Sequence, residues 1–110
     1  MMIAVTAQGM GPDAIVDPRF GRCQYIVFYD PATGNHTGQE NPSQHQAGGA
    51  GVNAAQFLAR NGVKTLITGQ VGPRASQALD AAGIGVYTGA SGTVQEVVQA
   101  YQAGQLQRMG

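Results

Sequence analysis

The sequence contains one cysteine and no tryptophan, and side chains that bind soft metals are few. A single thiol cannot form an internal disulfide. Besides Cys23, the only other soft ligands apart from methionine are His36 and His45. A closed structural zinc site of the Cys₄ or Cys₂His₂ type needs more ligands than these three, so the sequence argues against a zinc domain.

Long hydrophobic runs are also missing. No apolar stretch approaches the roughly 18 residues of a membrane-spanning helix. Residues 1–5 carry no basic side chain of the kind that opens a secretory signal. We therefore expect a cytoplasmic protein without a membrane partner.

Charged residues are scarce and balanced. They make up 11% of the 110 residues, six basic and six acidic, for a formal net charge of +0. Without an overall positive field, neither nucleic acid nor anionic lipid is an expected partner. A local positive field is still expected around Arg19 and Arg22, which lie three residues apart.

The first 40 residues predict three strands. Residues 3–7 and 25–29 are rich in β-branched and aromatic side chains, and a long loop containing glycine and proline separates them. A turn near residues 30–35 leads to a polar partner strand over residues 36–40. Because its side chains are polar, we expect this third strand at an edge of the sheet.

From residue 48 the pattern changes to alternating helices and strands. The expected order is a helix that ends at Asn61–Gly62, a strand over 64–68, a helix from Pro73 to Gly83, a strand over 85–88, and a helix that begins with the capping box Thr93–Glu96 and stops at Gly104. The whole order, β-β-β-α-β-α-β-α, predicts one α/β domain over residues 1–110. Its mixed sheet of five strands would be flanked by three helices.

Two glycine-rich segments precede helices, at residues 48–51 and 69–73. Glycine lets a ligand approach main-chain N–H groups, and a helix N-terminus adds partial positive charge, so the two segments together are suited to holding an anion. The same glycines are equally consistent with simple turns. A dinucleotide site is not indicated, because no apolar strand precedes Gly49 and no acidic residue follows about 20 positions on.

The remaining reactive side chains give no catalytic pattern. Cys23 lies beside Arg22, which favours a thiolate in an open loop, but a lone cysteine before an aromatic strand is more typical of a small buried hydrophobic residue. His45 lies in a polar loop, where an exposed side chain is the ordinary outcome. No base, nucleophile and orienting group are visible together, so we expect a protein that is not an enzyme.

A series of ordered motifs is similar to one protein family. The motifs are residues 16–23 (VDPRFGRC), 25–30 (YIVFYD), 49–55 (GAGVNAA), 69–73 (GQVGP), 82–87 (AGIGVY) and 92–96 (GTVQE). In this order they resemble the nitrogenase iron–molybdenum cofactor biosynthesis domain, the family of NifX, of NifB C-terminal regions and of orange proteins. The resemblance spans residues 3–106 and implies a ribonuclease H-like mixed sheet.

The resemblance also implies a function: non-covalent binding, protection and delivery of an anionic, molybdenum-containing sulfide cluster of the Fe–Mo or Mo–Cu type. Cofactor-binding members commonly place histidine before the Phe-Gly of the first loop, where this sequence has Arg19. That difference favours holding by charge and hydrogen bonds. The expected site residues are Arg19, Phe20, Gly21, Arg22, Gly49, Gly51 and Gly72, with Cys23 or His45 as candidate metal ligands.

The expected partners are therefore the cluster and a protein that receives it, and the chain is expected to be a monomer. The alternative function is a regulatory domain that binds a protein partner through the same loops and never meets a metal. An absorption spectrum and elemental analysis of protein isolated anaerobically would separate the two.

Overall fold

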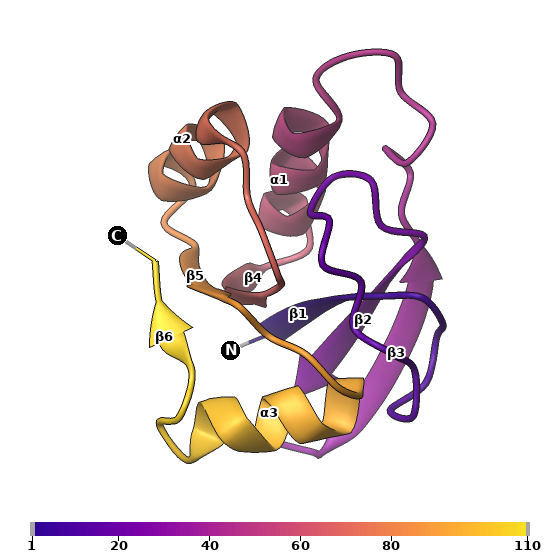
Figure 1. The fold of residues 1–110 in the computed structure, drawn as a ribbon, viewed down its shortest axis with the longest axis vertical. Coiled ribbons are helices and arrows are strands. Elements are labelled where there is room, and N and C mark those ends of the chain that lie inside the picture. The colour runs from indigo at the N-terminus through magenta and orange to yellow at the C-terminus, as the bar shows by residue number, and fades with distance from the viewer. Residues whose placement is uncertain (1, 110) are drawn as a thin grey trace.

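One mixed sheet of six strands forms the centre of the molecule in a computed structural model that describes residues 2–109 (Figure 1). The strands are β1 (Met2–Ala7), β2 (Tyr25–Asp30), β3 (Asn35–Glu40), β4 (Val63–Ile67), β5 (Gly85–Thr88) and β6 (Gln107–Arg108), and their order across the sheet is β3-β2-β1-β4-β5-β6. β1, β4 and β5 are parallel, whereas the pairs β1–β2, β2–β3 and β5–β6 are antiparallel. The α/β class and the mixed sheet predicted from the sequence are confirmed.

One edge of the sheet agrees with the prediction from the sequence, and the other edge carries an additional strand. The polar strand β3 lies at one edge, as expected from its side chains. The expected number of five strands is wrong by one, because β6 pairs with β5 at the other edge through Tyr87–Arg108 and Thr88–Gln107. β6 has only two residues, both polar and exposed, so no hydrophobic pattern marks it. Backbone pairing with β5 alone defines it as a strand.

The helices form a layer on each face of the sheet. They are α1 (Ala50–Arg60), α2 (Pro73–Ala81) and α3 (Val94–Gln102). Since successive side chains of a strand point to opposite faces, the strands supply two separate cores. The core on the α1 and α2 side includes Ala4, Ile26, Leu58, Leu66 and Leu79. The core on the α3 side includes Ile3, Val5, Ile67, Val94 and Val97. None of the helices within residues 2–109 has the length and hydrophobicity needed to cross a bilayer.

The helix N-termini differ in a way that bears on function. α3 begins with the predicted capping box, in which the Glu96 N–H donates to Thr93 Oγ1 at 3.2 Å and the Thr93 N–H donates to Glu96 Oε1 at 2.9 Å. α1 and α2 begin after Gly49 and Gly72, and neither N-terminus has a side-chain cap among the described residues. The first turns of α1 and α2 are therefore open to another acceptor.

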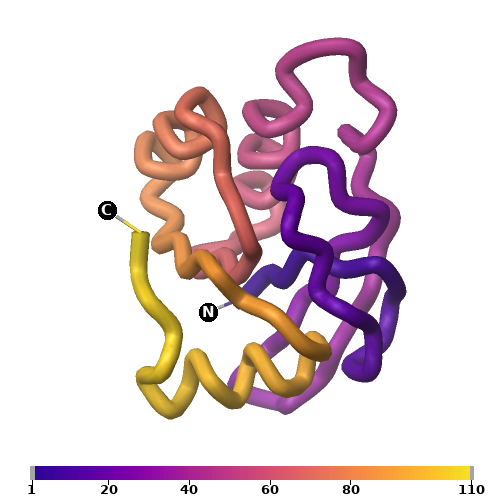
Figure 2. Tube along the Cα trace, viewed as in Figure 1, coloured from indigo at the N-terminus to yellow at the C-terminus, as the bar shows by residue number. Residues whose placement is uncertain are grey.

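The long loop of residues 8–24 brings distant segments to one end of the sheet (Figure 2). The Asp17 N–H donates to Thr6 O at 2.9 Å, which fixes the loop to β1. The Gln70 N–H donates to Pro18 O at 2.7 Å, and the Phe20 N–H donates to Gln70 O at 3.3 Å, which fix the loop to the segment before α2. The loop and the segments that precede α1 and α2 consequently meet.

Candidate functional site

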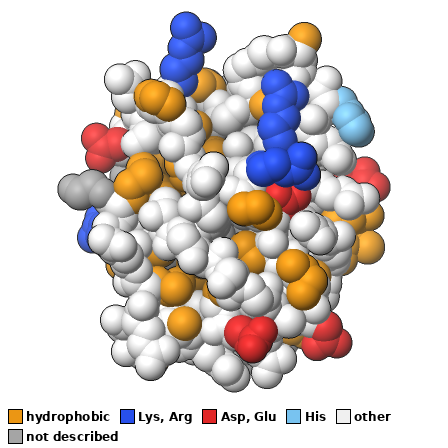
Figure 3. All heavy atoms as spheres, viewed as in Figure 1, with side chains coloured by type: hydrophobic (Ala, Val, Ile, Leu, Met, Phe, Trp, Pro, Cys, Tyr) orange, Lys and Arg blue, Asp and Glu red, His pale blue; other side chains and the backbone are white. Residues whose placement is uncertain are grey.

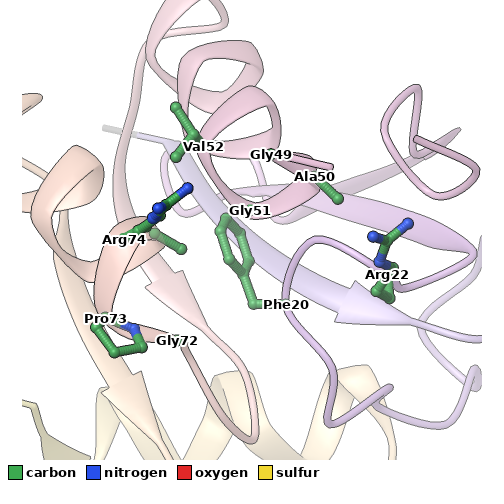
Figure 4. Close-up of a pocket in the computed structure, with 10 residues that line it drawn as sticks. Phe20, Arg22, Gly49, Ala50, Gly51, Val52, Gly72, Pro73 and Arg74 are labelled. Atoms are coloured by element: carbon green, nitrogen blue, oxygen red, sulfur yellow. The ribbon is translucent and has the colours of Figure 1, made fainter. Parts of the chain in front are cut away.

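A cavity of about 510 Å³ lies where the long loop meets the first turns of α1 and α2. The lining residues are Phe20, Arg22, Gly49, Ala50, Gly51, Val52, Gly72, Pro73, Arg74 and Ala75. In Figure 4 the Phe20 ring lies between the two helices, with Arg74 toward one side of the cavity and Arg22 toward the other. This volume lies within the range of small-ligand sites.

Two glycines allow the three segments to approach this closely. Gly21 has a φ of 92°, and a Cβ added there would lie 2.8 Å from both the Cα and the N of Gly51. A Cβ added to Gly51 would lie 2.7 Å from the Cβ of Ala75 in α2. Only glycine fits at positions 21 and 51 without moving the loop from α1 or α1 from α2.

Both helices contribute residues with unpaired main-chain donors to the cavity lining. The first helical hydrogen bonds are donated by Asn53 in α1 and by Ser76 in α2. The N–H groups that precede them have no acceptor within residues 2–109, and they belong to Ala50, Gly51 and Val52 in α1 and to Arg74 and Ala75 in α2. These groups carry the partial positive charge of two helix dipoles, so the site is suited to an anion.

The side chains around the cavity reinforce this charge. Arg22 and Arg74 are both exposed, and no acidic residue belongs to the described lining. Figure 3 shows basic side chains at two places on the end of the molecule where α1 and α2 begin. One Arg22 nitrogen, Nη1, also donates to the carbonyl oxygens of Gln44 and Gln46, which belong to the segment that leads into α1. Arg22 therefore connects the long loop to that segment.

Arg19 lies outside the cavity lining and has a different partner. Its guanidinium donates to both carboxylate oxygens of Asp17, each at 3.1 Å, and its N–H donates to Asp17 Oδ1 at 3.0 Å. Arg19 is 66% exposed, whereas the Asp17 side chain is only 1% exposed. Burial works to raise the pKa of Asp17, but the hydrogen bonds and charge of Arg19 outweigh it and hold this pKa below its ordinary value.

Cys23 belongs to the core on the α1 and α2 side and is fully buried. Burial, with a smaller contribution from the charge of Asp17, raises the pKa of Cys23 to about 12. Asn41, also buried, donates from Nδ2 to Gly21 O at 3.1 Å, to Cys23 O at 2.9 Å and to Cys23 Sγ at 3.4 Å. The thiol is therefore protonated at neutral pH and packed away from the cavity.

His45 is exposed in the segment between β3 and α1, and it does not line the cavity either. Among residues 2–109, no group of three or more His, Cys, Asp and Glu side chains is arranged to hold a metal ion. Of the predicted site residues, the cavity brings together Phe20, Arg22, Gly49, Gly51 and Gly72. Gly21 packs against the backbone of Gly51 without lining the cavity, and Arg19, Cys23 and His45 also lie outside the lining.

The chain matches a known protein family. The dinitrogenase iron-molybdenum cofactor family matches residues 1–104. The chain belongs to this family. This family is of a cofactor-biosynthesis type, and its description links it to the iron–molybdenum cofactor.

Solved structures from the same group show the same fold. The apo form of the orange protein from Desulfovibrio gigas matches with a TM-score of 0.95 and 47% identity, over 99% of this chain and 92% of that one. A NifB-like protein from Thermotoga matches with a TM-score of 0.85 and 36% identity, over 97% of this chain and 91% of that one. In a comparison of sequences rather than structures, an uncharacterized protein from Methanocaldococcus jannaschii is 26% identical over 96 residues, which cover 84% of this chain and 81% of that protein.

Two residues that build the candidate site in this member of the dinitrogenase cofactor family were not expected from the sequence. Arg74 follows directly after the motif of residues 69–73, and its place in the first turn of α2 was the available signal, since helical side chains lean toward the N-terminus. Asn41 holds the backbone of the Gly21–Cys23 segment, but an asparagine in a polar loop carries no sequence signal for that role.

Proposed function

We propose that this protein binds an anionic, molybdenum-containing sulfide cluster of the Mo–Cu or Fe–Mo type in the cavity between α1 and α2, without covalent attachment. It protects the cluster there and delivers it to a protein partner, and it catalyses no reaction. The observation that carries this proposal is the convergence of two uncapped helix N-termini and two arginines on one cavity whose described lining has no acid.

The donor set suits a cluster whose outer atoms are sulfides. The free N–H groups of the first turns and the guanidinium groups of Arg22 and Arg74 are all hydrogen-bond donors, and sulfide atoms of an anionic cluster accept such bonds. Phe20 and the small apolar residues of the lining remove water from the remaining surface, which strengthens these electrostatic contacts. The bound anion would also satisfy main-chain donors that the protein itself leaves open.

This mode of binding supports a carrier function. Many metal–thiolate bonds would make a cluster hard to release, whereas hydrogen bonds to N–H and guanidinium groups exchange readily. The only thiol is protonated and buried, in keeping with a cluster that arrives and leaves intact. In this proposal Arg19 supports the loop through Asp17, and Arg19, Cys23 and His45 do not belong to the cavity lining.

The experiment is an anaerobic titration with tetrathiomolybdate and Cu(I), followed by visible absorption and by elemental analysis after gel filtration. We compare wild type with Arg22→Gln and Arg74→Gln. Loss of one charge-assisted donor should weaken binding about ten- to a hundredfold in each variant. Arg60→Gln is the matched control, because Arg60 is an exposed arginine at the opposite end of α1.

Salt provides a second readout from the same titration. Binding by exposed charges should weaken as ionic strength rises, whereas direct metal–thiolate ligation should respond much less. Equal affinity in wild type, Arg22→Gln and Arg74→Gln, with no response to salt, would contradict the proposed site. In that case a domain that binds a protein partner through these loops becomes the better account.

A further inference from the structure

The outer edge of β3 pairs with no other strand among residues 2–109. β3 pairs with β2 along all six of its residues, Asn35–Glu40, in one continuous register, and it is the last strand on that side of the sheet. Its sequence, Asn-His-Thr-Gly-Gln-Glu, contains none of the lysines or prolines that commonly block sheet edges, and its register shows no bulge. The outward-facing backbone groups of β3 can therefore pair with another extended chain.

A second cavity, of about 280 Å³, adjoins this edge on the α3 side of the sheet. Its lining includes His36 of β3, Tyr29 of β2, and Gln95 and Gln99 of α3. The His36 ring lies against the Tyr29 ring with centroids 4.8 Å apart, and its Nε2 atom is buried without a hydrogen-bond partner among the described residues. A buried polar atom left without a partner is unfavourable, so a ligand that supplies one would be stabilised here.

An exposed apolar side chain lies next to this cavity. Met10 covers Gly38 so closely that a Cβ added to Gly38 would lie 2.4 Å from the Met10 Cβ, yet Met10 is 55% exposed. Gly38 and His36 are two residues apart, so they share one face of β3. An extended chain that pairs with this edge would place one side chain against Met10. Its next side chain on the same face, two residues away, would lie at the cavity beside His36.

The negative charge of the β2–β3 hairpin indicates the charge of a partner that would bind there. Residues 25–40 contain two acids, Asp30 and Glu40, and no lysine or arginine. Asp30 pairs with Asn35 at one end of β3, and Glu40 lies at the other end. This distribution favours a basic segment and disfavours a second copy of the same acidic edge.

We propose that the free edge of β3 binds an extended, basic segment of another protein, which adds to the sheet as a seventh strand. Alternate side chains of that segment contact Met10 and enter the cavity at His36, where a hydroxyl or another hydrogen-bonding group pairs with Nε2. This site is on the opposite side of the sheet from the cavity between α1 and α2, and it does not depend on cluster binding.

The test uses the cluster-free protein labelled with ¹⁵N and the capped peptide Thr-Lys-Val-Ser-Val-Lys-Thr as the probe. We expect amide shifts confined to β3, Met10 and the β3-facing side of α3. The same peptide with glutamate in place of both lysines should bind about tenfold more weakly or not at all.

Substitutions measure how much each side chain of this site contributes to peptide binding. Met10→Ser and Glu40→Lys should each weaken binding of the basic peptide about tenfold. Ile15→Ser and Asp80→Lys are the matched controls and should leave it unchanged, because Ile15 is 50% exposed and Asp80 is an exposed acid of α2. His36→Phe keeps the ring contact with Tyr29 but removes Nε2, so it should weaken peptide binding without lowering the thermal midpoint.

Three outcomes overturn the proposal. They are equal binding of the basic and acidic peptides, shifts that avoid β3, and self-association of the protein through β3 in the absence of peptide. Since cluster binding is measured at α1 and α2 and peptide binding at β3, failure of one does not imply failure of the other.

Discussion

Gly51→Ala tests the close packing that creates the cavity. The added Cβ would lie 2.7 Å from the Cβ of Ala75, far inside ordinary contact. Neither atom can rotate away, because each is fixed to a helix backbone, so α1 and α2 must separate. Overpacking of this kind costs about 1–3 kcal/mol. Replacing glycine in a helix recovers at most about 1 kcal/mol, so the net expectation is a destabilised protein.

The assay is urea unfolding followed by circular dichroism, with a second substitution as the rescue. In the double variant Gly51→Ala/Ala75→Gly the opposing Cβ is gone, and the next atom of residue 75, its Cα, lies 3.8 Å away. The double variant should therefore be more stable than the sum of the two single effects predicts. Gly72→Ala is the control, since no atom of residues 2–109 lies within 4 Å of a Cβ there. A Gly51→Ala protein as stable as wild type, or purely additive effects, would refute the packing argument.

Other perturbations test the supports of the site. Gly21→Ala should destabilise the protein more than Gly34→Ala, because both positions have positive φ but only Gly21 meets backbone atoms of α1; thermal unfolding of the two variants compares them. The Cys23 thiol, with its pKa raised by burial to about 12, should react with a disulfide reagent at pH 8 only after denaturation. The unfolded thiol ionises near its ordinary pKa of 9.0, so the contribution of Cys23 to the free energy of unfolding should fall as pH rises from 9.0 toward 12. Cys23→Ala should make the pH dependence in this range less steep. Arg19 lowers the pKa of Asp17, so the contribution of Asp17 to the free energy of unfolding is present above its ordinary pKa of 3.8 and is lost as pH falls below that value. In Arg19→Ala the free energy of unfolding should therefore decrease less steeply as pH falls below 3.8.

Local patterns were sufficient to predict most of the fold. The capping box at Thr93 fixes the start of α3, and the polar sequence of β3 indicates an edge strand; both predictions are confirmed. β6 could not be predicted, because two polar residues carry no periodicity and only pairing with β5 defines them as a strand. The sequence shows the preferences of each segment but not the pairing that depends on tertiary contacts.

The site was only partly predictable for the same reason. The glycines before α1 and α2 predict open helix N-termini, and the structure brings Gly49, Gly51 and Gly72 to one cavity. The partners of the arginines depend on the folded loops, so the sequence could not show that Arg19 is held by Asp17. The position of Arg74 directly after the motif of residues 69–73 was a signal for the cavity, but only the fold shows that Arg74 and Arg22 line it together.

The measurement that tests the central claim most directly is a ¹H–¹⁵N spectrum of the protein with and without a cluster assembled anaerobically from tetrathiomolybdate and Cu(I). Such a cluster is diamagnetic, so amide signals close to it remain visible. The account predicts large shifts for Ala50, Gly51, Val52, Arg74 and Ala75, whose N–H groups are free to donate to the cluster. Shifts confined to other segments, or no change at these five amides with the cluster bound, would contradict it.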